Sequence, residues 1–147
     1  YRTSPRTVRR VFNNLFAYLE GYGTLTGDKS DHDIQSDGNL HWCSTAEMPA
    51  DYLAPARARG WETNSIAADP KFTQFKLDVK TVNDYRLQKD SPAIAKGIVL
   101  PNELEDPLRP KDGARPDIGA VPVGTEPLKV GMHGRIVAGM PQPPEDK

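Results

Sequence analysis

Four acidic side chains occur close together in and beside one glycine-containing loop: Asp28, Asp31, Asp33 and Asp37. Hard cations such as Ca²⁺ take several carboxylate and carbonyl oxygens as ligands, and a flexible loop can supply them. The spacing differs from the EF-hand pattern, which requires D-x-D-x-D-G and a later Glu. The residues predict a Ca²⁺ site in this loop, and the alternative is an acidic loop that is simply solvated.

Two histidines, His32 and His41, lie close to these acids in the sequence. Histidine exchanges a proton near neutral pH and is therefore a common general acid or base. On a strand, His41 should point to the face opposite Leu40, because successive side chains alternate. We take His32 and His41 as candidate catalytic residues. The alternative is that each is a surface or packed side chain.

Candidate substrate-binding groups lie upstream, at Arg9, Arg10, Tyr18 and Tyr22. The planar donors of arginine suit the carboxylates or sulfates of an acidic polysaccharide. Elimination on a uronate requires such charge neutralisation, together with a base that removes the C5 proton. The tyrosine rings could stack on sugar faces. The alternative for the arginines is a basic edge that is exposed or paired with preceding chain.

The segment from Val8 to Leu19, which carries most of these groups, fits two patterns. Its branched and aromatic residues favour strands interrupted at Asn13-Asn14, whereas its apolar spacing also fits a helix. Strands are favoured because the pair Asn14-Leu15 recurs as Asn39-Leu40, 25 residues later. That spacing suits one coil of a β-solenoid.

This repeat makes a specific prediction about stacking between neighbouring coils. Leu15 should stack on Leu40 inside the coil, and Ala17 should stack on Trp42 two positions further on. An asparagine at the bend should bond through its amide to the asparagine of the next coil.

Residues 44–62 have a different character and predict a short lateral helix. Ser44 begins an S-x-x-E sequence, which has the form of a capping box. Pro49 and Pro55 limit the helix to about Ala50 to Ala58. We expect Tyr52, Leu53 and Trp61 to dock it, a set of contacts with a structural role.

A series of short motifs then follows in order: Asp69-Pro70-Lys71-Phe72, Asp84-Tyr85-Arg86-Leu87, Ser91-Pro92-Ala93-Ile94-Ala95-Lys96-Gly97 and Asp117-Ile118-Gly119-Ala120. Each reads as a brief extended segment or turn set by Pro or Gly. Tyr85 and Leu87, alternating with charged residues, predict a half-buried strand. The ordered set resembles the C-terminal end of right-handed parallel β-helix proteins of the pectate-lyase-like superfamily.

The resemblance covers residues 8–124 and implies an all-β fold, a right-handed parallel β-helix ending in an irregular cap. We expect the last coils at residues 1–43, the lateral helix at 44–62, a terminal coil and capping strap at 63–124, and a partly disordered tail at 125–147. The catalytic groups of such proteins usually project from middle coils. We therefore expect them on preceding sequence.

Composition limits the remaining classes of function. The formal net charge of −1 argues against a field that would hold nucleic acid. There is no apolar run of the length that spans a bilayer. The lone Cys43 excludes an intramolecular disulfide framework and is expected to be a small core residue. Low use of cysteine does not distinguish the cytoplasm from a bacterial exterior.

The resemblance to pectate-lyase-like proteins implies that this is the C-terminal part of a carbohydrate-active protein, extracellular or periplasmic, that acts on acidic polysaccharide. The complete protein, if it is an enzyme, would be a polysaccharide lyase or a glycoside hydrolase. The partners expected are a polysaccharide ligand and upstream β-helix coils, from the same or a separate chain. The alternative is a non-catalytic surface or adhesion solenoid that this segment caps.

Overall fold

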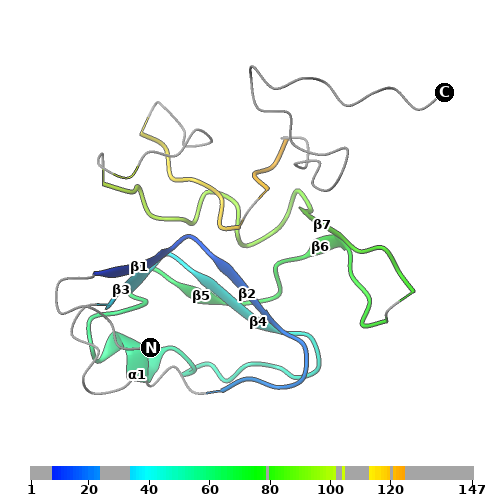
Figure 1. Ribbon diagram of the computed structural model, residues 1–147, viewed down its shortest axis with the longest axis horizontal. Coiled ribbons are helices and arrows are strands. Elements are labelled where there is room, and N and C mark those ends of the chain that lie inside the picture. Colours follow the sequence, from blue (N-terminus) through cyan, green and yellow to red (C-terminus); the bar gives the residue numbers. More distant parts are fainter. Residues whose placement is uncertain are drawn as a thin grey trace.

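The computed structural model describes residues 8–23, 34–78, 80–101, 104, 113–119 and 121–124. Within these residues the chain forms mainly short strands, in line with the expected all-β class (Figure 1). The elements in chain order are β1 (Arg9–Phe12), β2 (Leu15–Tyr18), β3 (Ile34–Asp37), β4 (Leu40–Cys43), α1 (Ala54–Arg57), β5 (Ile66–Ala67), β6 (Phe72–Gln74) and β7 (Asp84–Leu87). None of the described helical residues forms a span that could cross a membrane.

Parallel pairing joins strands that lie one repeat apart in the sequence. β1 pairs with β3 and β2 with β4, while β5 continues the second sheet as β2–β4–β5. Leu15 lies beside Leu40 and Ala17 beside Trp42. The predicted strands between Val8 and Leu19 and their predicted register are therefore confirmed. The sheets themselves are small and open.

Side chains at the bends connect the successive strands. The backbone N–H of Asn14 donates to Asn39 Oδ1 at 2.8 Å, and the N–H of Asn39 donates to Ser65 Oγ at 2.7 Å. We call this row of residues the Asn–Asn–Ser ladder. It confirms the predicted contact between Asn14 and Asn39, and it adds Ser65, a third rung that the sequence reading did not identify.

A C-terminal strap, residues 88–98 and 113–119, covers one face of β2 and β4. Ala93 and Ile118 are fully buried against Leu40, and the Ile118 N–H donates to the Ala93 carbonyl at 2.9 Å. The strap is held at the bend by Asn13, whose side chain accepts from the Ile98 N–H at 2.7 Å and donates to the Ile98 carbonyl at 3.0 Å. The strap thus completes a small apolar core.

The opposite face of β4 is also covered. Figure 1 shows the strap on one side of β4 and the 44–62 segment on the other. Leu40 therefore faces the strap, while His41 faces the 44–62 segment and packs beside Tyr52. The prediction that Leu40 and His41 point oppositely is confirmed. Of the alternatives left open for His41, the structure shows a packed side chain, because it is 1% exposed.

The lateral helix is shorter than expected and begins later. α1 follows a turn at residues 50–53, and Leu53 at its N-terminus makes no side-chain capping bond. Ser44 instead donates to the Leu19 carbonyl at 3.2 Å, so the predicted capping box is wrong. Tyr52 and Leu53 are buried as expected. The early start fails because Pro49 and Pro55 leave too few consecutive residues for a longer helix.

The β6–β7 hairpin is antiparallel and lies beside the stack. Leu87 is half-buried as predicted, whereas Tyr85 is 55% exposed, so its predicted burial is wrong. The Tyr85 ring instead meets Phe72 edge-on, with the centroids 5.3 Å apart. The hairpin therefore carries an aromatic group at the surface. Residues 125–147, expected to form a tail, lie outside the described residues.

Candidate functional site

Three of the four acids and one candidate base lie outside the described residues. These are Asp28, Asp31, Asp33 and His32. The fourth acid, Asp37, holds a turn: its carboxylate accepts from the N–H groups of Gly38 at 2.8 Å and Asn64 at 2.6 Å. Among the residues that the structure describes, no three acids, histidines or cysteines gather in a metal-binding group. The Ca²⁺ site stays a prediction.

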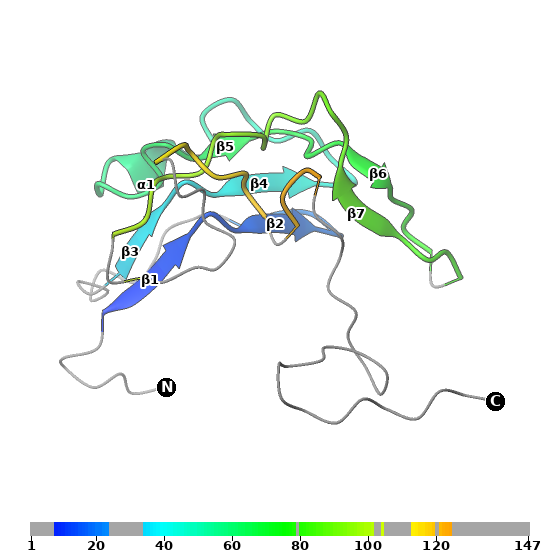
Figure 2. The same ribbon diagram turned by 90° about the horizontal axis from the view of Figure 1, so that it is seen from above.

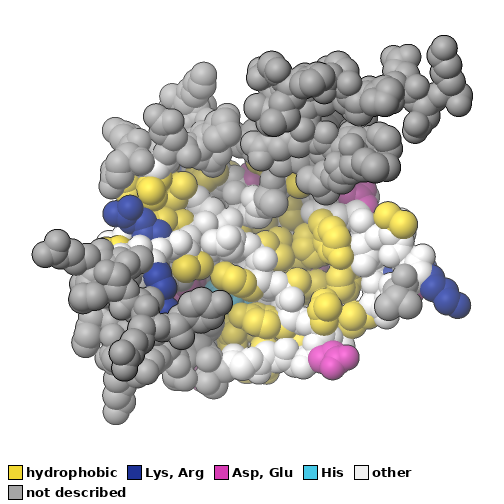
Figure 3. Space-filling model, viewed as in Figure 1, with side chains coloured by type: hydrophobic (Ala, Val, Ile, Leu, Met, Phe, Trp, Pro, Cys, Tyr) yellow, Lys and Arg dark blue, Asp and Glu magenta, His cyan; other side chains and the backbone are white. Residues whose placement is uncertain are grey.

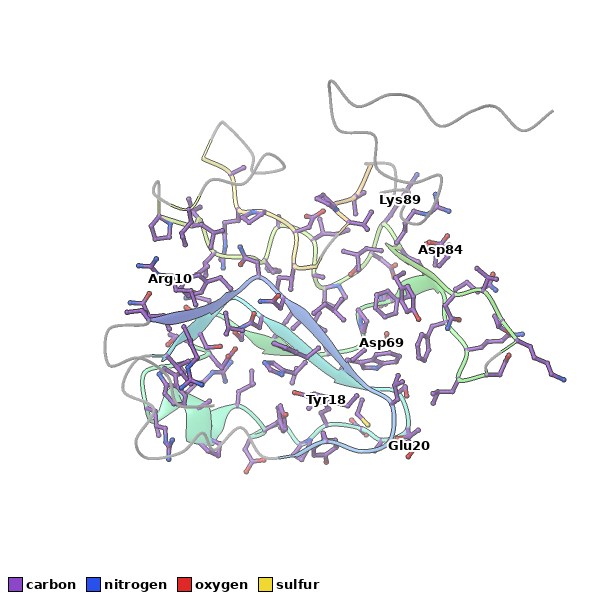
Figure 4. All side chains as sticks on the ribbon, viewed as in Figure 1. Arg10, Tyr18, Glu20, Asp69, Asp84 and Lys89 are labelled. Atoms are coloured by element: carbon purple, nitrogen blue, oxygen red, sulfur yellow. The ribbon has the colours of Figure 1, made fainter. Side chains whose placement is uncertain are left out.

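The candidate binding residues are divided between two places. Arg9 and Arg10 are exposed on β1, and Arg10 Nε donates to Gln35 Oε1 at 3.2 Å. Figure 4 shows Arg10 at the outer end of β1, away from Tyr18, whose side chain extends from β2 into the area between the sheets and the 44–62 segment. Tyr22 lies near Tyr18 through Tyr52, which both rings contact edge-on.

The structure brings Tyr18 and His41 together in a buried hydrogen-bond chain. Tyr52 Oη donates to Tyr18 Oη at 3.2 Å, and Tyr18 Oη lies 3.0 Å from His41 Nδ1. On its other side, His41 Nε2 lies 3.4 Å from Glu62 Oε2. We call these four residues the Tyr–Tyr–His–Glu chain.

The direction of the hydrogen bonds along this chain depends on the tautomer of His41. In the neutral tautomer with the proton on Nε2, His41 donates to Glu62 and accepts on Nδ1 from Tyr18. Tyr18 then accepts from Tyr52 with its remaining lone pair. Every hydroxyl and ring nitrogen in the chain has a partner. A buried polar network is stabilising only when it is satisfied in this way.

Local structure positions each member. Tyr18 and His41 project to the same face of the β2–β4 pair, and Phe16 stacks on the His41 ring with centroids 5.0 Å apart. Glu62 adopts a left-handed conformation, with φ at +53°, and its N–H donates to the Ser36 carbonyl at 2.8 Å. A left-handed non-glycine residue is unfavourable by itself. The surrounding contacts therefore hold Glu62 in place.

Glu62 is the electrostatic centre of the cluster. Its side chain accepts from Ser36 Oγ and from Asn39 Nδ2, the latter at 3.1 Å to Oε2. Burial by itself raises the pKa of this carboxyl, but hydrogen bonds from His41, Ser36, Ser65 and Asn39 outweigh it and lower the pKa to about 2. Burial, followed by the contact with Tyr18, raises the pKa of Tyr52.

The lowered pKa of Glu62 predicts that the fold loses stability in acid. The folded pKa of Glu62 lies below its ordinary value, so the ionised carboxylate stabilises the fold above the ordinary pKa and stops doing so as the pH falls through the folded one. The free energy of unfolding should fall by about 3 kcal/mol between pH 4.5 and pH 2 from this group alone.

Urea unfolding across this pH range, compared with a Glu62→Gln variant, isolates the contribution of Glu62 from that of the other carboxyl groups. The variant should lack the added acid sensitivity. Equal pH slopes for the two proteins would show that Glu62 is not the group responsible.

The chemical capacity of the cluster is limited by its burial. His41 is 1% exposed and Glu62 is 4% exposed, whereas Tyr18 is half-buried. Within the described residues, the imidazole is therefore almost closed to a ligand. The arrangement is therefore better suited to holding β2, β4 and the 44–62 segment together than to direct acid–base catalysis by His41.

Glu62, Asn39 and Ser65 are functional candidates that the sequence reading missed. A weak signal for them exists, because Ser65-Ile66 follows Asn39-Leu40 by 26 residues and Glu62 follows Ser36 by the same interval. Serine replaces asparagine in the third copy, which hides the repeat.

A cavity of about 560 Å³ lies at the edge of β2, away from the Tyr–Tyr–His–Glu chain. Its lining is mainly apolar and comes from the bend before β2, from β2, from the hairpin and from the strap: Asn13, Asn14, Leu15, Ala17, Phe72, Tyr85, Leu87, Ile118, Gly119 and Val121. Figure 3 shows hydrophobic side chains gathered across the middle of this face of the molecule, with Lys and Arg at its outer ends.

Comparisons with known proteins find no matching family model, no matching curated protein and no matching solved structure. The site is therefore interpreted from its own geometry.

Proposed function

We propose that this chain is the C-terminal part of a carbohydrate-active protein, a right-handed parallel β-helix that acts on acidic polysaccharide outside the cell or in the periplasm. The observation that carries the proposal is the parallel pairing of β1 with β3 and of β2 with β4 at one constant interval. Parallel strands joined by bends at a fixed period are the defining feature of such solenoids.

Two further observations support the architectural part of the proposal. The Asn–Asn–Ser ladder repeats one side-chain-to-backbone contact from rung to rung. The C-terminal strap then buries Leu40 under Ala93 and Ile118, as a cap for the last rungs would. The ordered motifs that resemble pectate-lyase-like proteins provide the link to polysaccharide.

The catalytic groups of this proposal belong to preceding coils. Within the described residues, His41 is enclosed by Tyr18 and Glu62 and cannot meet a polymer directly. Arg9 and Arg10 lie exposed on β1, where they could contact the carboxylates of a bound chain at the end of a longer groove.

The second candidate is a non-catalytic surface or adhesion solenoid that this segment caps. The enclosure of His41 favours it, because the best candidate base of the described chain is used for structure. The two candidates differ in whether the complete protein cleaves polysaccharide.

The test is a panel of alginate, pectate and glycosaminoglycans, with a neutral glucan as the control. A longer polypeptide that contains this chain should release unsaturated uronates or new reducing ends from an acidic member, whereas residues 1–147 alone should release none. Binding without cleavage would support the adhesion solenoid. No cleavage of any acidic polymer by the longer polypeptide would contradict the carbohydrate-active proposal and favour the adhesion solenoid.

The two arginines of β1 allow a test of polysaccharide binding by this chain, with a second exposed charge as the control. An Arg9→Gln, Arg10→Gln double variant should bind the acidic polymer several-fold more weakly, and added salt should reduce the difference, because the contacts are electrostatic. Lys89→Gln, which removes an exposed charge away from β1, is the control.

A further inference from the structure

The outer edge of the strand stack is formed by β1 and β2. Within the described residues, β1 pairs only with β3, and β2 pairs only with β4. Figure 2 shows β1 and β2 on the same side of the stack, with β5 and α1 on the other side. Two strands therefore present backbone groups along one continuous edge, which is a template for a further strand.

The hydrogen bonds at the bend between these strands repeat from one rung to the next, so they predict the contacts of one further rung. At each step, a bend residue donates its N–H to a side-chain oxygen of the next rung: Asn14 to Asn39, then Asn39 to Ser65. The carbonyl of each bend residue also accepts a backbone hydrogen bond from the next rung. The Leu40 N–H donates to the Asn14 carbonyl at 2.8 Å, and the Ile66 N–H donates to the Asn39 carbonyl at 2.9 Å.

Applied to the outer edge, the same rule names both contacts of an incoming strand. Its bend residue would donate its N–H to Asn14 Oδ1 and accept from the Leu15 N–H. The Asn14 amide nitrogen already donates to the Phe12 carbonyl at 2.9 Å, which turns the side chain along the edge. These contacts require a parallel strand, because an antiparallel one would not place its bend over Asn14.

The cavity beside β2 indicates what the incoming side chains should be. It is bounded by Leu15 and Ala17 on the strand, and by Leu87 and Ile118 on the hairpin and strap. Ala17 is small where its neighbour Trp42 is large, which leaves room for a large residue opposite Ala17. An apolar lining favours protein side chains over sugar hydroxyls, which need many polar partners.

We propose that the edge of β1 and β2 binds a parallel strand pair from the coil that precedes it in a longer polypeptide. The incoming pair places a bend residue with a free backbone N–H opposite Asn14, and a large apolar residue opposite Ala17. This inference rests on the repeat architecture in the proposed function, and it adds the register and residue types of the partner. It extends the β2–β4–β5 sheet by one strand.

A peptide with the sequence of residues 34–43, carrying Cys43→Ser, mimics such a coil because it already has an Asn-Leu bend and a tryptophan two positions on. Titrated into the full chain, it should shift the NMR signals of residues 9–18. A spin label at the N-terminus of the peptide should broaden signals of β1, and one at its C-terminus those of β2. A peptide with Asn39→Pro, which lacks the backbone N–H that would donate to Asn14 Oδ1, should bind at least fivefold more weakly.

Two variants of the chain test the site itself. Ala17→Asp places a charge in the apolar cavity and should abolish binding, whereas Ala67→Asp, on the exposed β5 at the other side of the stack, should leave it intact. The inference is overturned by shifts at β5 instead of β1 and β2, by antiparallel broadening, by unchanged binding to Ala17→Asp, or by no binding.

The result is separable from the proposed polysaccharide activity. Peptide binding in register, together with an inactive longer polypeptide, would remove the activity and leave the docking edge. Self-association of the chain that Ala17→Asp abolishes, without peptide binding, would assign the edge to a second copy and overturn the inference.

Discussion

Replacing Glu62 with alanine should lower the free energy of unfolding by about 3–5 kcal/mol, the range seen when a buried charged partner is removed. The carboxylate accepts from Ser36, Asn39 and His41, and the substitution removes the acceptor of the buried His41 Nε2. Ser36 and Asn39 keep the Val11 carbonyl as a second acceptor. The left-handed backbone at this position does not enter the difference, because alanine and glutamate are both disfavoured there.

Urea unfolding monitored by circular dichroism measures this effect, and two variants calibrate it. Glu62→Gln keeps the size of the side chain and one accepting oxygen, so it should cost about 1–3 kcal/mol. Glu47→Ala removes an exposed carboxylate and should stay within about 0.5 kcal/mol of the parent. Equal losses of stability in Glu62→Ala and Glu47→Ala would show that the Tyr–Tyr–His–Glu chain does not stabilise the fold.

The second large effect is expected at the apolar core on the other face of β4. Leu40 is fully buried with Ala93 and Ile118, and Leu40→Ala should cost about 2–5 kcal/mol, since the lost transfer energy adds to the cost of the cavity. The strap lies directly on this side chain. Its hydrogen exchange should therefore accelerate more than that of the 44–62 segment.

Leu77→Ala is the matched control, because Leu77 is 51% exposed. It should change the free energy of unfolding by no more than about 0.5 kcal/mol. Equal losses at Leu40 and Leu77, or faster exchange confined to residues 44–62, would contradict the assignment of Leu40 to the core under the strap.

The parallel register could be predicted from the sequence because it follows from a local repeat. Asn14-Leu15 and Asn39-Leu40 carry the same residue types at the same bend, so their spacing alone aligns β2 with β4. The third rung escaped prediction because Ser65 supplies a hydroxyl oxygen in place of the asparagine amide. One hydrogen-bond role was conserved in the structure while the residue type changed.

The buried site could be predicted only in part. Alternation on a strand places His41 opposite Leu40, but it cannot say what covers that face. The cover comes from Tyr52 and Glu62, whose positions depend on how α1 and the following turn return to the sheet. Glu62 in particular reads as a surface residue, and only its donors make burial favourable.

At the β6–β7 hairpin, the sequence pattern predicted burial of a side chain that the structure leaves exposed. Alternation of apolar and charged residues predicted that Tyr85 would face inward with Leu87, yet Tyr85 is exposed. Tyr85 and Leu87 both line the cavity beside β2, so the alternation places them on one face. The pattern does not say how completely the rest of the chain covers that face, and at Tyr85 the side chain is 55% exposed.

The attachment of the strap to Asn13 has a consequence for the order in which the protein forms during synthesis. Asn13 bonds to Ile98, 85 residues further along the chain, and its carbonyl accepts from the Gly119 N–H at 3.0 Å. Leu40 therefore remains without its cover until Ile118 has left the ribosome. For that interval the nascent chain exposes an apolar sheet face, and chaperone capture or aggregation competes with closure of a long loop.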